Sequence, residues 1–158
     1  MQVDAERAVR GYLWIAGAGL LLQGVISFAL LPFTREPSRA TDELLGSSYR
    51  HLAIHIVWGL VMLGALLRPL PARQLAWITL GFGVFYLAFG IAGYQEHDPF
   101  GIHMHRGENR FHLIVGSLAL AIGACALWSM SRSRGTSIPI GAGTPEMQIG
   151  DKGSDREW

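Results

Sequence analysis

Four long apolar stretches constrain the fold of this 158-residue chain more than any other feature. A membrane hydrocarbon core ~30 Å thick is crossed by about 20 apolar residues in an α-helix, and within one segment only a helix satisfies its own backbone there. The candidate spans are approximately residues 12–32, 51–67, 74–94 and 109–130. The first three contain no Asp, Glu, Lys or Arg, and the fourth contains one charged residue, Arg110. The sequence therefore predicts an all-α, four-helix transmembrane bundle.

Composition supports a single membrane domain. Charged residues make up 16% of the chain, against ~25% in soluble domains. The formal net charge of +1 gives no electrostatic reason to expect a nucleic-acid partner, and the one cysteine, Cys125, cannot form an intramolecular disulfide. We expect a transmembrane domain over residues 1–131. Residues 132–158, rich in Gly, Ser, Pro and charge, are expected to form a disordered cytoplasmic tail.

Arginines near the span ends predict the orientation, because basic residues favour the cytoplasmic side. Six of them precede the first span, connect the second to the third, or follow the fourth: Arg7, Arg10, Arg68, Arg73, Arg132 and Arg134. Five lie on the other side: Arg35, Arg39, Arg50, Arg106 and Arg110. The bias, and the short basic connection around residues 68–73, predict a multi-pass protein of the cell membrane with both termini in the cytoplasm.

An internal repeat relates the two halves of the chain. His55 and Gly59 in the second span match His112 and Gly116 in the fourth, as His-x-x-x-Gly. In the odd spans, Trp14-Ile15 precedes Gly17 and Gly19 as Trp77-Ile78 precedes Gly81 and Gly83. Such a duplicated helical hairpin keeps the same orientation in both copies and predicts His55 and His112 at similar depth on diagonal helices. The glycines themselves are typical of close helix packing.

These elements resemble a bacterial family of four-helix integral membrane proteins known as a domain of unknown function. The resemblance covers roughly residues 9–130. It rests on the paired motifs His55–Gly59 and His112–Gly116, the basic connection at Arg68 and Arg73, Tyr86 with Gly90 and Gly93, and Asn109. The resemblance implies a membrane bundle and transfers no activity.

Histidines are the candidate site residues. The candidate metal ligands are His51, His55, His103, His105 and His112. His51 and His55 are four residues apart and share a helix face. Together with nearby carboxylates, such nitrogens suit zinc, copper or non-haem iron. A second hypothesis makes His55 and His112 the two axial ligands of a haem held between helices.

The histidine spacing also allows less specific interpretations. It matches no closed structural zinc motif. One His-x-x-x-His step resembles a single box of the membrane di-iron desaturases and hydroxylases, but the adjacent histidine pairs of the other boxes are absent. Histidines in polar outer loops and at the membrane interface would produce the same pattern, and such residues can also sense external pH.

The leading interpretation is a structural or accessory membrane subunit. We therefore expect a protein without enzymatic activity. It would act in the lipid bilayer through helix–helix contacts with itself or with a larger complex. Glycine-rich faces and the aromatics Trp58, Phe82, Phe85 and Phe89 would supply those contacts. No ionisable side chain lies at the centre of a span, which argues against a proton pump. The alternative is a metal- or haem-binding membrane protein with an outward-facing histidine site.

Overall fold

The computed structural model describes residues 2–30, 33, 49–96, 101–102 and 104–134, which contain four α-helices and no strand. The helices are α1 (Gln2–Leu30), α3 (Tyr49–Leu66), α4 (Ala72–Gln95) and α5 (Arg106–Arg134). Each is long and apolar enough to cross a membrane. The predicted all-α four-helix bundle of a multi-pass membrane protein is confirmed.

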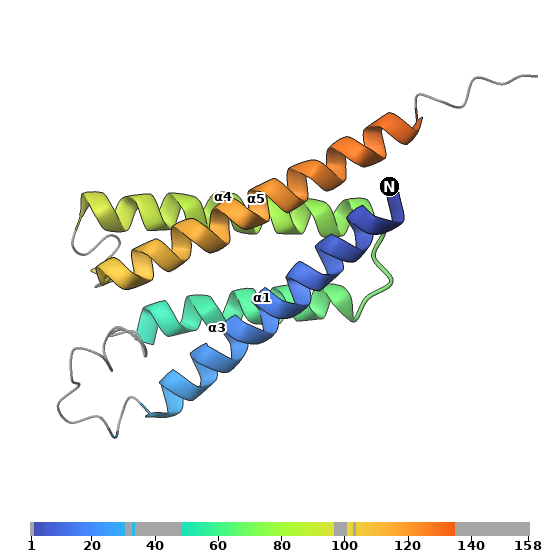
Figure 1. The fold of residues 1–158 in the computed structure, drawn as a ribbon. Coiled ribbons are helices and arrows are strands. Elements are labelled where there is room, and N and C mark those ends of the chain that lie inside the picture. The colour runs from blue at the N-terminus through green and yellow to red at the C-terminus, as the bar shows by residue number, and fades with distance from the viewer. Residues whose placement is uncertain (1, 31–32, 34–48, 97–100, 103, 135–158) are drawn as a thin grey trace, which may run out of the picture.

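The helices form two hairpins that pack against each other. Figure 1 shows α1 paired with α3, and α4 paired with α5, with α3 and α5 on a diagonal. The start of α1, the α3–α4 connection and the end of α5 lie at the same end of the bundle. A topology with both termini on one side of a membrane requires this arrangement.

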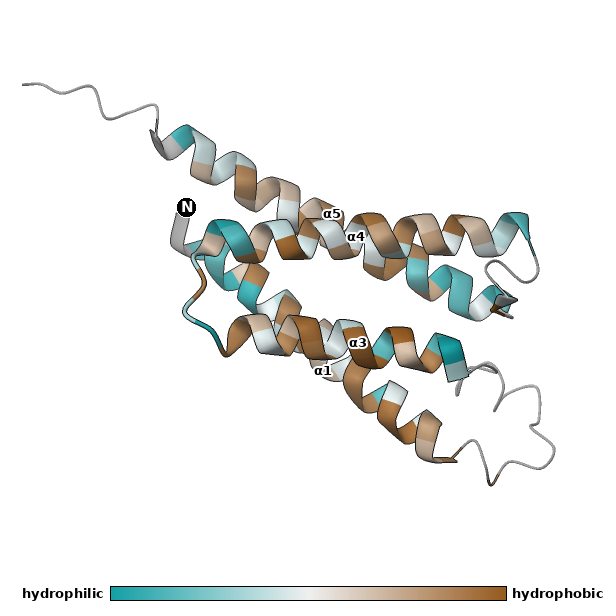
Figure 2. Ribbon diagram, turned by 180° about the vertical axis from the view of Figure 1, so that it is seen from behind, coloured by the Kyte–Doolittle hydropathy of each residue, from teal (hydrophilic) through white to brown (hydrophobic). Residues whose placement is uncertain are grey.

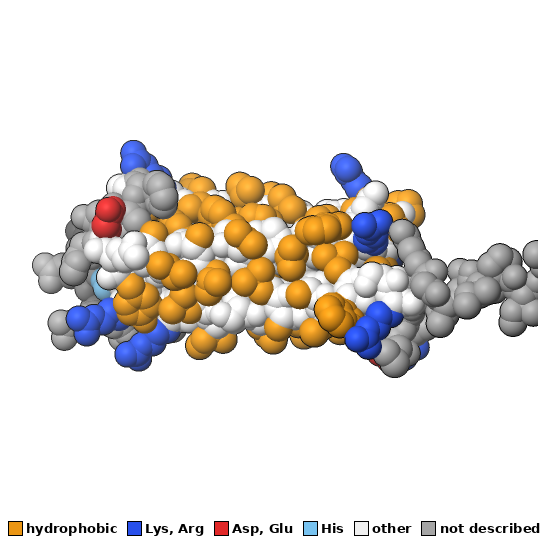
Figure 3. Space-filling view, turned by 90° about the horizontal axis from the view of Figure 1, so that it is seen from above, with side chains coloured by type: hydrophobic (Ala, Val, Ile, Leu, Met, Phe, Trp, Pro, Cys, Tyr) orange, Lys and Arg blue, Asp and Glu red, His pale blue; other side chains and the backbone are white. Residues whose placement is uncertain are grey.

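The surface carries an apolar belt between two charged ends. In Figure 2 the hydrophilic residues gather near the helix ends, and Figure 3 shows arginine side chains at both ends of an apolar surface. Large apolar side chains within the belt are well exposed, including Ile15 at 79% and Ile114 at 68%. A continuous exposed apolar surface of this kind is covered by lipid in a membrane protein.

Two helices are longer than predicted, because hydropathy detects only the part that lies in hydrocarbon. The helix α1 starts ten residues before residue 12, and its early turns are held by an ion pair of 2.9 Å between Arg10 Nε and Glu6 Oε1. The helix α5 continues beyond residue 131, where the Arg132 guanidinium lies 4.8 Å from the centre of the Trp128 ring. The rest of the predicted tail, residues 135–158, lies outside the described residues.

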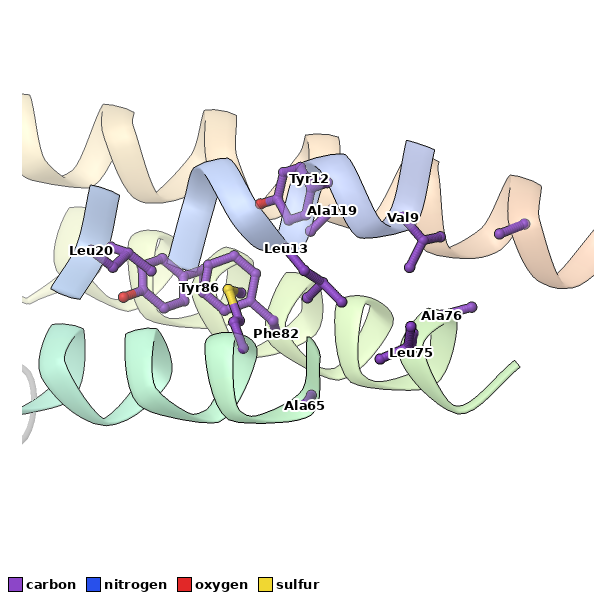
Figure 4. Packing of buried hydrophobic residues seen from close by; sticks show 12 residues of the cluster. Val9, Tyr12, Leu13, Leu20, Ala65, Leu75, Ala76, Phe82, Tyr86 and Ala119 are labelled. Carbon is purple, nitrogen blue, oxygen red and sulfur yellow. The ribbon is translucent and has the colours of Figure 1, made fainter. Parts of the chain in front are cut away.

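Some of the aromatic side chains expected on the outside fill the interior of the bundle instead. Figure 4 shows Phe82 and Tyr86 of α4 side by side beneath α1, with Leu20 next to them, and both rings are fully buried. The ring of Trp58 meets Phe82 edge-on at 5.2 Å between centroids. Phe89 is 5% exposed. The expectation that these aromatics form an external contact face is therefore wrong for Phe82 and Phe89.

Glycines bring the helix backbones into contact in both hairpins. In the first, a Cβ added at Gly59 would lie 2.9 Å from the carbonyl oxygen of Gly17. In the second, a Cβ added at Gly116 would lie 3.0 Å from the carbonyl oxygen of Gly83. Such separations admit glycine alone, so α1 packs on α3 and α4 on α5 through equivalent backbone contacts.

The equivalent contacts fix the register of the internal repeat. They match Gly17 with Gly83, and Gly24 with Gly90. The alternative match suggested by the Trp-Ile pairs, which sets Gly17 against Gly81, is wrong, because a Cβ at Gly81 would meet no atom within 4 Å. The buried glycines therefore define the register of the repeat, because each must keep two helix backbones in contact. Side chains that face lipid are under no such constraint.

Candidate metal centre

Three histidine side chains converge inside the bundle. His51 and His55 lie one turn apart on α3, and His112 reaches them from α5. His112 Nε2 lies 3.2 Å from His51 Nε2 and 3.5 Å from His55 Nε2. The ligand nitrogens of all three lie within 4.8 Å of one another. The residues are 1%, 4% and 0% exposed, so the cluster is buried.

The nitrogen spacing matches that of ligands on one small cation. Two imidazole nitrogens at a Zn–N distance of 2.0–2.1 Å in tetrahedral geometry lie about 3.3–3.4 Å apart. The observed separations of 3.2 Å and 3.5 Å from His112 fall on either side of that value. Both separations from His112 are therefore compatible with nitrogen ligands on one tetrahedral ion.

Gln23 of α1 fixes the orientation of one of these imidazoles. The Nδ1–H of His55 donates a hydrogen bond to Gln23 Oε1, and the Gln23 amide in turn donates to Ser27 Oγ at 3.4 Å. A histidine that carries its proton on Nδ1 presents a lone pair on Nε2. The contact thus directs the lone pair of His55 toward His112, as outer-sphere partners do in metal sites.

Glu108 lies behind the second imidazole, that of His51. Its Oε1 lies 3.3 Å from His51 Nδ1, and the carboxylate is 8% exposed. Its Oε2 accepts a 2.8 Å hydrogen bond from the backbone N–H of His105, which closes the first turn of α5 as in a capping box. The helix start therefore holds the carboxylate behind the imidazole, in the arrangement of a carboxylate–histidine–metal triad.

Close packing of α4 positions His112. A Cβ added at Gly90 would lie 3.1 Å from His112 Cβ, so glycine lets the two helices meet at this depth. The Asn109 amide donates a 2.7 Å hydrogen bond to the Gly93 carbonyl and sets the register of α5 on α4. The Tyr86 ring meets the His112 ring edge-on at 5.1 Å. Among the described residues, the His112 Nδ1 atom has no hydrogen-bond partner.

The residues of this site occupy matched positions in the two copies of the internal repeat. The contacts that match Gly59 with Gly116 also match His55 with His112, and His51 with Glu108. Both matched pairs face each other across the bundle, at 3.5 Å between Nε2 atoms and at 3.3 Å from Nδ1 to Oε1. The predicted diagonal placement of His55 and His112 is thus seen. The second copy has Glu108 at the position of His51. Three imidazoles and one carboxylate therefore face each other, where an exact repeat would place four imidazoles.

A cavity of 290 Å³ opens beside the histidines. Its walls come from α1, at Gly19, Leu20 and Gln23, and from the first turns of α5, at Gly107 and Phe111. The cluster and Glu108 form the remaining wall. A site with three protein ligands and a free neighbouring space is the arrangement that leaves a fourth metal position open to an exogenous ligand.

The structure brings together three of the five residues predicted as metal ligands. It gathers His51, His55 and His112, whereas His105 stands apart with its Nδ1 3.7 Å from Glu108 Oε2. His103 lies outside the described residues. Sequence reasoning did not single out Glu108 as a partner of His51, although its place three residues after His105 has the spacing of a capping box.

Gln23 meets the cluster from mid-span on α1. Its amide oxygen accepts from His55, and the nearby Tyr86 hydroxyl has no hydrogen-bond partner within the described part of the chain. A lone amide in an uncharged span was the signal that could have marked it as a site residue.

The haem hypothesis does not fit this geometry. Axial ligands approach the iron from opposite faces of the macrocycle. Here the Nε2 atoms of His55 and His112 are 3.5 Å apart, and His51 Nε2 lies 3.2 Å from His112 beside them. The spacing of these two nitrogens would by itself suit two axial ligands, but the His51 imidazole and the packed helices lie where the macrocycle would have to extend.

No protein-family model, curated protein or solved structure matches the chain. The likeness to the four-helix family of unknown function stays a prediction.

Proposed function

We propose that this protein is a membrane metalloprotein that binds one divalent transition-metal ion through His51, His55 and His112. The observation that carries the proposal is the convergence of three buried imidazole nitrogens at 3.2 Å and 3.5 Å. Zn²⁺ fits best, since it favours tetrahedral sites with nitrogen ligands. Its fourth position would face the cavity between α1 and α5.

The polar groups around the cluster support an ion rather than an empty core. Gln23 holds the Nδ1 proton of His55, and the Glu108 carboxylate lies 3.3 Å from His51 Nδ1, which leaves the Nε2 atoms of both histidines facing His112. Buried polar atoms without a partner destabilise a fold, and a neutral His112 can donate a single proton to them. One cation accepts all three lone pairs, and the Glu108 carboxylate offsets part of its charge.

The alternative role as a structural or accessory subunit draws on features that serve the bundle itself. Gly17, Gly59, Gly83 and Gly116 are used in contacts within the two hairpins. The buried aromatics fill the interior. The histidine geometry favours the metalloprotein, and the two roles separate cleanly by metal content. With the arginine bias predicted above, the centre would lie in the outward-facing half of the cell membrane.

The test is the metal content of protein purified without a metal-affinity step. We expect about one zinc, copper or iron ion per chain, as three strong nitrogen ligands imply, measured by mass spectrometry of the elements. His112→Ala should lose the metal while keeping its helical circular dichroism. His105→Ala is the matched control and should keep it. Metal far below one ion per chain for all three elements, even after dialysis against Zn²⁺, would refute the proposal and favour the accessory subunit.

A further inference from the structure

The repeat gives the bundle two equivalent faces that differ in one respect. One face lies between α3 and α4, the other between α1 and α5. The matched positions set Phe85 against Gly19, and Trp58 against Val115. On the first face the Phe85 and Trp58 rings are 5.4 Å apart and line a separate apolar cavity of 430 Å³. On the second, a Cβ added at Gly19 would meet no atom within 4 Å. Both faces are hollowed, but on the α1–α5 face, called the open face below, glycine stands where the matched face has Phe85.

The open face contains an apolar groove of 600 Å³ between α1 and α5. The groove shares Gly19, Leu20 and Phe111 with the cavity at the histidines, so the two spaces adjoin. Together they extend along α1 from Ala8 to Gln23. At 1.5 Å per helical residue this is about 22 Å, most of the ~30 Å thickness of a hydrocarbon core. The space has the length of a lipid chain and ends at the proposed metal.

The charge at the histidine end of this space indicates which chemical group would bind there. Three neutral imidazoles leave the full charge of a divalent ion, and the carboxylate of Glu108 offsets one unit. The remaining positive charge lies in a buried site, where an unpaired charge is costly. An anionic oxygen at the fourth position would neutralise it and complete the tetrahedron.

We infer that the groove binds a single-chain amphiphile with a carboxylate head, such as a long-chain fatty acid. The head would bind the metal at the histidine cluster, and the chain would lie along α1 and α5 past Gly19. This inference rests on the proposed metal centre and adds the class of ligand that its open position takes. The competing occupant is an ordinary bilayer lipid chain that never reaches the metal.

The test uses the full chain in phospholipid nanodiscs loaded with Co²⁺. Unlike Zn²⁺, Co²⁺ has visible absorption bands that report on its ligands. Palmitate is titrated as the long-chain probe and acetate as the head group alone. Gly19→Phe, which copies the matched Phe85, should block the chain. Gly81→Phe places the same ring on another exposed part of the bundle, where a Cβ also meets nothing within 4 Å.

We expect palmitate to change the Co²⁺ spectrum of the unmodified protein and of Gly81→Phe at the same concentration. Gly19→Phe should need about tenfold more palmitate, which corresponds to ~1.4 kcal/mol, while acetate acts equally on all three proteins. No response to palmitate, or an equal response in Gly19→Phe, would overturn the inference and leave bilayer lipid as the occupant. Absence of Co²⁺ binding before any carboxylate is added would instead refute the metal centre itself, and the inference with it.

Discussion

Replacing Glu108 with glutamine tests the electrostatic part of the metal centre in isolation. The carboxylate lies 3.3 Å from His51 Nδ1 and is 8% exposed. Glutamine has nearly the same shape, and its side-chain oxygen can still accept the hydrogen bond from the His105 backbone that closes the first turn of α5. The substitution therefore removes a charge behind a ligand and keeps the helix start.

The expected effect is weaker metal binding. The carboxylate increases the donor strength of the His51 imidazole and opposes the charge of the bound cation, so its loss raises the dissociation constant. Outer-sphere substitutions of this kind cost about 10- to 100-fold in metal affinity, or ~1.4 to 2.7 kcal/mol. The low exposure of both groups places Glu108→Gln toward the upper part of that range, because solvent screens the pair little.

The assay is competition for Zn²⁺ against a chromophoric chelator, with detergent-purified protein at fixed pH and salt. Glu6→Gln is the matched control, since Glu6 is partly exposed and pairs with Arg10 on α1. The control should keep the affinity of the unmodified protein. An affinity for Glu108→Gln within twofold of the unmodified protein, or an equal loss in Glu6→Gln, would refute the role given to this carboxylate.

Two further predictions concern the packing that holds the site together. Gly59→Ala should destabilise the bundle by ~1 to 3 kcal/mol, because its Cβ would lie 2.8 Å from the backbone nitrogen of Leu21. At Gly64 an added Cβ meets no atom within 4 Å. Gly64→Ala should therefore stabilise the bundle by up to ~1 kcal/mol, because alanine has the higher helix propensity. Unfolding in denaturing detergent followed by circular dichroism separates the two, and equal effects would contradict the packing argument. Tyr12→Phe should cost ~0.6 to 1.7 kcal/mol in the same assay, because it removes the 2.9 Å hydrogen bond from the hydroxyl to the Val115 carbonyl that joins α1 to α5; unchanged stability would show that this bond adds nothing.

Much of the architecture follows from the sequence because it depends on local properties. The hydrocarbon thickness sets the length of each span, so runs of apolar residues locate all four helices. The helical period places His51 and His55 on one face without knowledge of any neighbour. The two His-x-x-x-Gly motifs indicate that a second histidine, His112, lies at matching depth. These inferences need no information on how the helices turn relative to one another.

The composition of the site required the tertiary structure. Successive residues of a helix point about 100° apart, so a small rotation of α5 would take His112 away from α3. The rotation is set by backbone contacts at Gly83 and Gly90, which no single-helix pattern contains. His105 stays outside the cluster because it precedes α5, about 10 Å from His112 along the helix axis. The sequence by itself determined the spans and the depth of the histidines, whereas helix rotation, fixed by glycine packing, decided which nitrogens meet.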